Sequence, residues 1–156
     1  MMRFPRLCLC FMLAAVASLR AAPPPAAAAT VTWDLVMIEA MKTSIYVGSV
    51  TLTTSEFRRE GDQYTATYAA KVWPWAFWNE TGRITIQLPA ADIERLRRGE
   101  RVEFKGDAAN HKNKPRHVTG RADRIDANSG KIKVRIGVDD TELIFNGTFR
   151  VPAAGG

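Results

Sequence analysis

The chain has 156 residues, a formal net charge of +6, 46% hydrophobic residues and two cysteines. A single domain is expected for this length, because a chain of about 130–150 residues buries roughly two-thirds of its unfolded surface. Both cysteines, Cys8 and Cys10, lie in an apolar run near the N-terminus. If that run is removed, no thiol remains, which excludes disulfides, thiolate zinc sites and cysteine nucleophiles.

The N-terminus has the three parts of a secretory signal peptide. Arg3 and Arg6 supply positive charge, Leu7–Val16 is an apolar run of ten residues, and small residues follow through Ala22. The run is well short of the roughly 20 apolar residues of a spanning helix, so we predict no transmembrane span after cleavage. The predicted division is a signal peptide at 1–22, a stiff Pro/Ala linker at 23–29 and a single β-domain at 30–156.

Removal of the predicted signal peptide lowers the net charge of the chain. Arg3, Arg6 and Arg20 leave with it, so 19 Lys and Arg residues remain against 16 Asp and Glu residues, a net charge of +3. This balance is ordinary and removes most of the case for a nucleic-acid partner. We predict a periplasmic or secreted protein.

Apolar residues then alternate with a period of two, which is typical of half-buried antiparallel strands. In the clearest case Tyr64, Ala66 and Tyr68 face one way and Thr65 and Thr67 the other. About eight strands are predicted, at Val31–Glu39, Ser44–Thr54, Tyr64–Val72, Gly82–Leu88, Glu100–Ala108, Arg116–Asp126, Lys131–Val138 and Leu143–Val151. This all-β pattern predicts a barrel or strongly curved sheet, with a two-sheet sandwich as the alternative.

One segment has the pattern of a helix. Pro89 starts it, Ile93 and Leu96 are three residues apart, and Gly99 ends it. We predict a short surface helix near residues 90–98.

The last two strands are predicted to form a hairpin that turns at Asp139–Asp140. Asn146–Gly147 is a rival turn, but the alternation continues through it without a change of phase. Gly147 is therefore expected inside a strand, where a neighbour approaches closely or the strand bulges.

The most unusual stretch is Trp73–Trp78, which holds three of the four tryptophans and one proline. If exposed, it is a large apolar patch of the kind that marks a binding surface. The alternative, which the sequence marginally favours, is a loop that folds back and closes one end of the core. The functional hypothesis is an aromatic lip at the mouth of a barrel, with inward residues such as Tyr64 and Tyr68 around a ligand cavity. The candidate ligand-binding residues are Trp73, Trp75, Phe77, Trp78, Tyr64 and Tyr68.

Other candidate sites are weaker. His111 and His117, with Asp107 nearby, are possible metal ligands, but their spacing matches no known ligand pattern, and we predict no metal and no cofactor. The same basic stretch, with Arg121 and Arg124, would suit the phosphates of an acidic polymer or a lipid headgroup. No serine lies in a nucleophile-elbow motif, so we predict that the protein is not an enzyme.

The spacing over Ile45–Gly82 resembles the opening strands of uncharacterised exported bacterial β-proteins, known as domains of unknown function. The matching features are Gly48-Ser49-Val50-Thr51-Leu52, Gly61-Asp62-Gln63-Tyr64 and Ala70-Lys71-Val72, followed by an aromatic stretch and Gly82. The later Phe104, Val118–Gly120 and Phe145 stretches resemble lipocalin-like periplasmic isoprenoid binders. These likenesses imply a setting in the bacterial envelope and an apolar ligand.

The functional prediction is an exported, non-catalytic domain that binds an apolar or amphipathic ligand, such as a lipid, or an envelope component through the aromatic loop. A docking module without a ligand cavity, for an envelope protein or the cell wall, is the main alternative. A polyanion binder and an unrecognised hydrolase rank lower.

Overall fold

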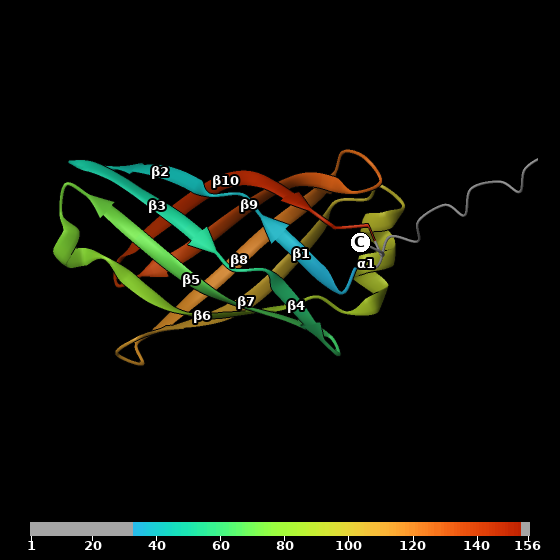
Figure 1. The fold of residues 1–156 in the computed structure, drawn as a ribbon, viewed down its shortest axis with the longest axis horizontal. Helices are drawn as coiled ribbons and strands as arrows, with labels where there is room; N and C mark the ends of the chain where they lie inside the picture. Colours follow the sequence, from blue (N-terminus) through green and yellow to red (C-terminus); the bar gives the residue numbers. More distant parts are fainter. Residues whose placement is uncertain (1–32, 154–156) are drawn as a thin grey trace, which may run out of the picture.

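The computed structural model describes residues 33–153, which form one closed antiparallel β-barrel (Figure 1). The predicted signal peptide and Pro/Ala linker lie outside the described residues. The strands are β1 (Leu35–Ile38), β2 (Met41–Ile45), β3 (Gly48–Thr54), β4 (Phe57–Glu60), β5 (Gln63–Trp73), β6 (Glu80–Gln87), β7 (Val102–Asn110), β8 (Pro115–Arg124), β9 (Ser129–Val138) and β10 (Thr141–Arg150).

The chain runs up and down around the barrel, so strands adjacent in sequence are adjacent in space. β1 and β2 follow one another along one barrel strand, and β3 and β4 along the next, so the ten segments make eight barrel strands. Pairing of β5 with β6, and of β1 with β10, completes the ring. The predicted eight-stranded barrel is confirmed, and the sandwich alternative is wrong.

Side-chain alternation fills the interior, as expected for a barrel of eight strands. Tyr64, Ala66 and Tyr68 are buried, whereas the intervening residues of β5 are more exposed. Val118 and Phe145 are among the most deeply buried side chains. The period-two pattern therefore identified the inward face of this wall correctly.

The first strands differ from the prediction. The expected single strand Ser44–Thr54 is wrong, because a turn at Tyr46–Val47 divides it into the end of β2 and the whole of β3. Gly48 has φ of +146°, and a Cβ there would collide with the Trp73 carbonyl group. An aromatic and a β-branched residue carry no turn signal, so Gly48 was the one local sign of this hairpin.

The C-terminal hairpin is confirmed. β9 and β10 pair through their full lengths about the Asp139–Asp140 turn, and Asp139 has the left-handed φ of +51°. Gly147 lies within β10, where an added Cβ would come within 2.5 Å of the Met41 Cγ. Close approach of β2 therefore explains this glycine, and Asn146–Gly147 is not a turn.

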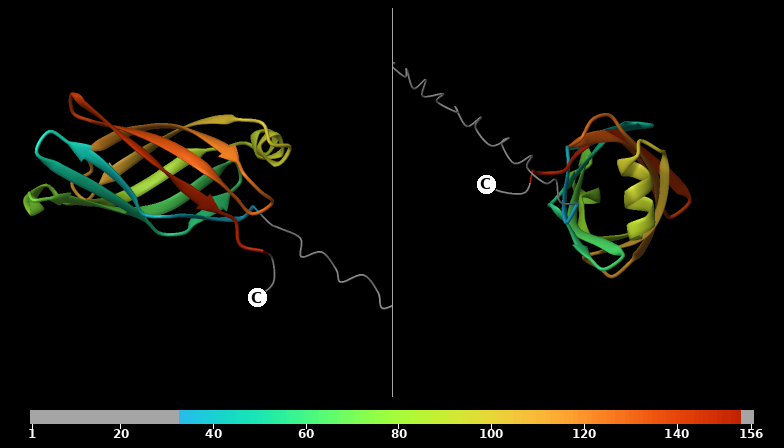
Figure 2. Two further views of the ribbon diagram at one scale, coloured as in Figure 1. Left: turned by 90° about the horizontal axis from the view of Figure 1, so that it is seen from above. Right: turned by 90° about the vertical axis from the view of Figure 1, so that its right-hand side faces the viewer.

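Helix α1 (Ala90–Arg97) confirms the predicted helix and lies across one end of the barrel (Figure 2). Pro89 is its N-cap residue, and Ile93 and Leu96 are buried. We call this the closed end. The turns β2–β3, β5–β6, β7–β8 and β9–β10 all lie at the opposite end, the loop end (Figure 1). Within the described residues, no helix has the length and apolarity needed to span a membrane.

Candidate functional site

Large apolar side chains gather on two neighbouring segments of the loop end. Trp73, Phe77 and Trp78 are 71%, 74% and 57% exposed, and Trp75 is 38% exposed. Tyr46 and Val47, on the β2–β3 turn, are also exposed. We call these six residues the aromatic rim. A contiguous patch of exposed apolar side chains commonly marks an interaction site.

Strand pairing brings the two parts of the rim together. β3 pairs with β5 so that Ser49 lies opposite Trp73, which places the β2–β3 turn beside the β5–β6 loop. The Trp73–Pro74 peptide bond is cis, and a short 3-10 helix, η1 (Ala76–Trp78), follows. Asn79 anchors the far side of the loop, because its Oδ1 accepts a hydrogen bond of 2.8 Å from the backbone N–H of Val72.

The rings of the loop pack mainly on one another. Ring centroids are 5.8 Å apart for Trp75 and Phe77, 6.0 Å for Trp75 and Trp78, and 5.2 Å for Phe77 and Trp78, with tilted or edge-on contacts. No residue of η1 is buried. The loop is therefore an exposed lip, and the alternative in which it folds back to close the core is wrong.

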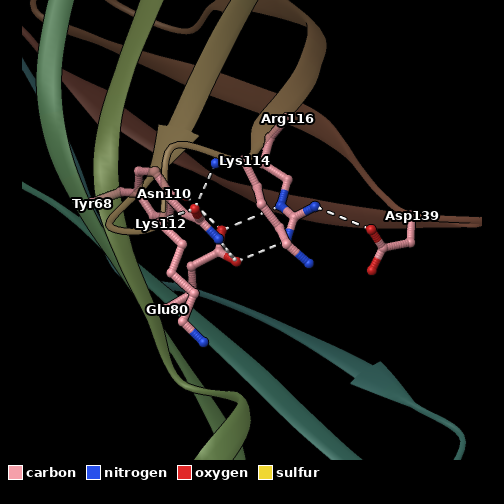
Figure 3. A network of polar contacts seen from close by, with 7 residues as sticks. All are labelled: Tyr68, Glu80, Asn110, Lys112, Lys114, Arg116 and Asp139. Carbon is pink, nitrogen blue, oxygen red and sulfur yellow. Dashed lines mark hydrogen bonds and ion pairs between the residues drawn. The ribbon is translucent and has the colours of Figure 1, made fainter.

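A network of polar side chains lies directly beneath this lip, at the loop end of the interior (Figure 3). Glu80 is the first residue of β6, and its Oε2 accepts hydrogen bonds from Arg116 Nη2 at 2.9 Å and Asn110 Nδ2 at 3.0 Å. Its Oε1 accepts from the Tyr68 hydroxyl at 2.6 Å and from Arg116 Nε at 3.3 Å. Both oxygens of this carboxylate are thus fully engaged.

The electrostatics of the network keep Glu80 ionised. Burial alone raises the pKa of Glu80, but hydrogen bonds from Arg116, Tyr68 and Asn110 outweigh it and lower the pKa to about 2. Burial, together with the hydrogen bond to Glu80, raises the pKa of Tyr68. The hydrogen bond to Glu80 also raises the pKa of Arg116. A carboxylate held in this way is a weak base, which suits a structural role better than proton transfer.

The network also fixes the turns of the loop end. Asn110 Oδ1 accepts hydrogen bonds from the backbone N–H groups of Lys112 and Lys114 at 3.0 and 2.9 Å, which shapes the β7–β8 turn. Arg116 Nη1 also reaches Asp139 Oδ1, in the β9–β10 turn, at 3.4 Å. The base of the rim is therefore tied to three of the loop-end turns.

Tyr64 and Tyr68 are buried parts of the barrel wall. The Tyr64 hydroxyl donates a hydrogen bond to the Trp33 carbonyl oxygen near the closed end, and burial raises the pKa of Tyr64 to about 12. The apolar cavity that Tyr64 lines has a volume of about 50 Å³. Pockets for small molecules usually measure about 300–1,000 Å³, so this cavity is too small for a lipid chain. The structure brings the four loop residues together but places the two tyrosines in the packed interior.

The histidines do not converge. His117 Nδ1 lies 3.1 Å from Asp107 Oδ1, but both side chains are more than three-quarters exposed. His111 lies in the β7–β8 turn, beyond the end of β7. Within residues 33–153, no three His, Cys, Asp or Glu side chains are placed to hold a metal ion.

Two parts of the site were not predicted from the sequence. Tyr46 and Val47 were assigned to a strand, and Gly48 was the one local sign that a turn lies there. Glu80 and Arg116 are 36 residues apart, and only the pairing of β6, β7 and β8 brings them together. From the sequence, Arg116 was predicted to start a strand beside a basic loop, and no local pattern indicated a buried partner.

The fold and the site define a small up-and-down β-barrel with an aromatic rim above a buried charged network. Comparison with protein-family models, with curated proteins and with solved structures finds no match to this chain.

Proposed function

We propose that this protein is an exported, non-catalytic β-barrel that binds the amphipathic lipid surface of the bacterial envelope through its aromatic rim. The observation that carries the proposal is the exposure of six large apolar residues on adjoining loops at one end of the barrel. The proposed mode of binding is contact of the rim with the lipid surface, with the lipids outside the barrel.

The residue types of the rim suit a lipid surface. Tryptophan and tyrosine favour the boundary between headgroups and acyl chains, because each joins an apolar ring to a polar N–H or O–H group. Complete burial of a phenylalanine side chain contributes roughly 1.5–3 kcal/mol. Docking costs orientational freedom, so several rings acting together are needed. The rim supplies Trp73, Trp75, Phe77 and Trp78, with Tyr46 beside them.

The network beneath the rim supports the same proposal. Glu80 follows the aromatic loop directly and is fixed by Tyr68 from the neighbouring β5 and by Arg116 from β8. A loop with a rigid base loses less conformational entropy when it binds. The network thus contributes to binding by holding the rings in place.

The second candidate function is docking on an envelope protein. The small interior cavity and the compact cluster of rings favour it, because tryptophan-rich clusters often provide most of the binding energy of protein interfaces. Binding that requires a protein and leaves pure lipid vesicles untouched would support this candidate.

Co-sedimentation with vesicles of phosphatidylethanolamine and phosphatidylglycerol tests the lipid proposal. We expect the wild-type protein to sediment with the vesicles and the double variant Phe77→Ser/Trp78→Ser to stay in solution. Ile125→Ser is the matched control, because Ile125 is 58% exposed but lies beyond β8, at the closed end. Absence of wild-type binding, or equal loss in the control variant, would contradict the proposal.

A further inference from the structure

A second surface feature lies on the outer wall of the barrel, away from the rim. It is a hollow of about 570 Å³ across β6, β7, β8 and β9, which we call the basic hollow. Its polar lining includes Gln87, Lys105, Thr119, Arg121, Lys133 and Arg135. Glu103 also lines it, as one carboxylate among four cations.

Strand register gathers these side chains into two rows. In the first row Gln87 pairs with Lys105, Lys105 with Thr119, and Thr119 with Arg135. In the second row Glu103 pairs with Arg121, and Arg121 with Lys133. The inward residues between them, such as Phe104 and Val134, are buried in the core, so alternation directs both rows to the outer surface.

The cations of the hollow are poorly neutralised. Within residues 33–153, Lys105, Arg121 and Lys133 form no ion pair, and Arg135 has a long contact of 3.7 Å with Glu142. Arg121 lies directly opposite Lys133, and like charges in that position destabilise a sheet.

Two arginines outside the hollow have close acidic partners. Arg101 pairs with Asp123 at 2.6 Å, and Arg95 pairs with Glu100 at 3.1 Å. Four cations share the hollow with the single carboxylate of Glu103, so a bound anion would relieve the repulsion between them.

We propose that the basic hollow binds a ligand that carries two or more phosphate groups. The guanidinium groups of Arg121 and Arg135 present paired donors that match phosphate oxygens, and Lys105 and Lys133 add point charges. Gln87 and Thr119 supply neutral donors in the first row, beside Lys105 and Arg135. The open volume of about 570 Å³ accommodates a ligand larger than a single phosphate ion.

The site is independent of the rim. Lys105 lies five residues from Asn110 at the end of β7, which is about 16 Å along the strand. A molecule docked on the rim therefore leaves the hollow open.

Isothermal titration calorimetry of the full chain at low salt tests the proposal with two probes, tripolyphosphate and glycerol 1-phosphate. We expect saturable binding of tripolyphosphate that weakens as salt is added. Arg121→Gln/Lys133→Gln should weaken it by about tenfold or more, because two charge-assisted contacts are lost. Tighter binding of tripolyphosphate than of glycerol 1-phosphate, which has a single phosphate, supports a ligand with two or more phosphates, and comparable binding of the two probes would contradict it.

Lys42→Gln/Lys71→Gln is the matched control. It removes the same charge from exposed positions on β2 and β5, outside the hollow. We expect its affinity for tripolyphosphate to stay within about twofold of wild type, because separated surface charges are screened. Equal weakening in both double variants, or the absence of saturable wild-type binding of tripolyphosphate, would overturn the proposal. Circular dichroism of each variant confirms that it is folded.

Discussion

The two ends of the barrel are completed by different kinds of chemistry. At the closed end, α1 places Ile93 and Leu96 against an apolar interior. At the loop end, the interior is completed by the charged network of Glu80 and Arg116, and the aromatic residues lie outside it.

The two ends differ in how much their apolar side chains contribute to the stability of the fold. Apolar side chains at the closed end bury themselves and stabilise the fold by removal of apolar surface from water. The rim residues gain little of that stabilisation, because they remain exposed in the folded chain. The loop end therefore presents apolar surface that its own fold does not use.

The largest effect that sharpens this comparison is expected at the buried ion pair. Arg116 is only 8% exposed, so Arg116→Met leaves Glu80 without its cation in a partly buried position. Loss of one partner of such a pair costs about 3–5 kcal/mol, to be measured by urea unfolding at neutral pH. The double variant Glu80→Leu/Arg116→Met should recover much of this loss. A cost below about 1 kcal/mol for Arg116→Met alone would show that the network does not support the loop end.

The next effect compares one apolar residue from each end. Leu96 is 2% exposed, and Leu96→Ala should lower the free energy of unfolding by about 2–5 kcal/mol through the cavity that it leaves. Phe77→Ala, at the exposed rim, should change it by less than about 0.5 kcal/mol. The same urea titration measures both. Similar costs for the two variants would mean that the rim belongs to the core.

A smaller effect is expected from pH. The pKa of Glu80 is lowered from 4.5 to about 2, so its contribution to stability is complete above pH 4.5 and is lost as pH falls toward 2. The contribution is at most about 3 kcal/mol. Unfolding titrations between pH 6 and pH 2 should show a steeper decline for wild type than for Glu80→Gln. Parallel declines would contradict the assignment of the low pKa to Glu80.

Much of the fold was predictable because alternation records which face of a strand is buried. The pattern through Phe145, Gly147 and Phe149 identified a single strand and rejected a turn at Asn146–Gly147. The turn at Tyr46–Val47 was missed, because its backbone is determined by Gly48 against the Trp73 carbonyl group and not by turn-forming residues.

The site was only partly predictable. The cluster of tryptophans marked the aromatic loop, but its exposure depends on η1 and on the register of β3 with β5. The pair of Glu80 and Arg116 required the register of three strands. Long-range pairing of this kind leaves no local pattern in the sequence.

Tryptophan quenching by brominated lipids tests the central claim most directly. Trp73, Trp75 and Trp78 lie on the rim, whereas Trp33 is buried near the closed end. Vesicles of dibrominated phosphatidylcholine and phosphatidylglycerol should quench most of the emission of the wild-type protein, and the emission that remains should match that of a Trp73→Phe/Trp75→Phe/Trp78→Phe variant. Emission that brominated and ordinary vesicles leave equally unchanged would contradict docking of the rim on a lipid surface.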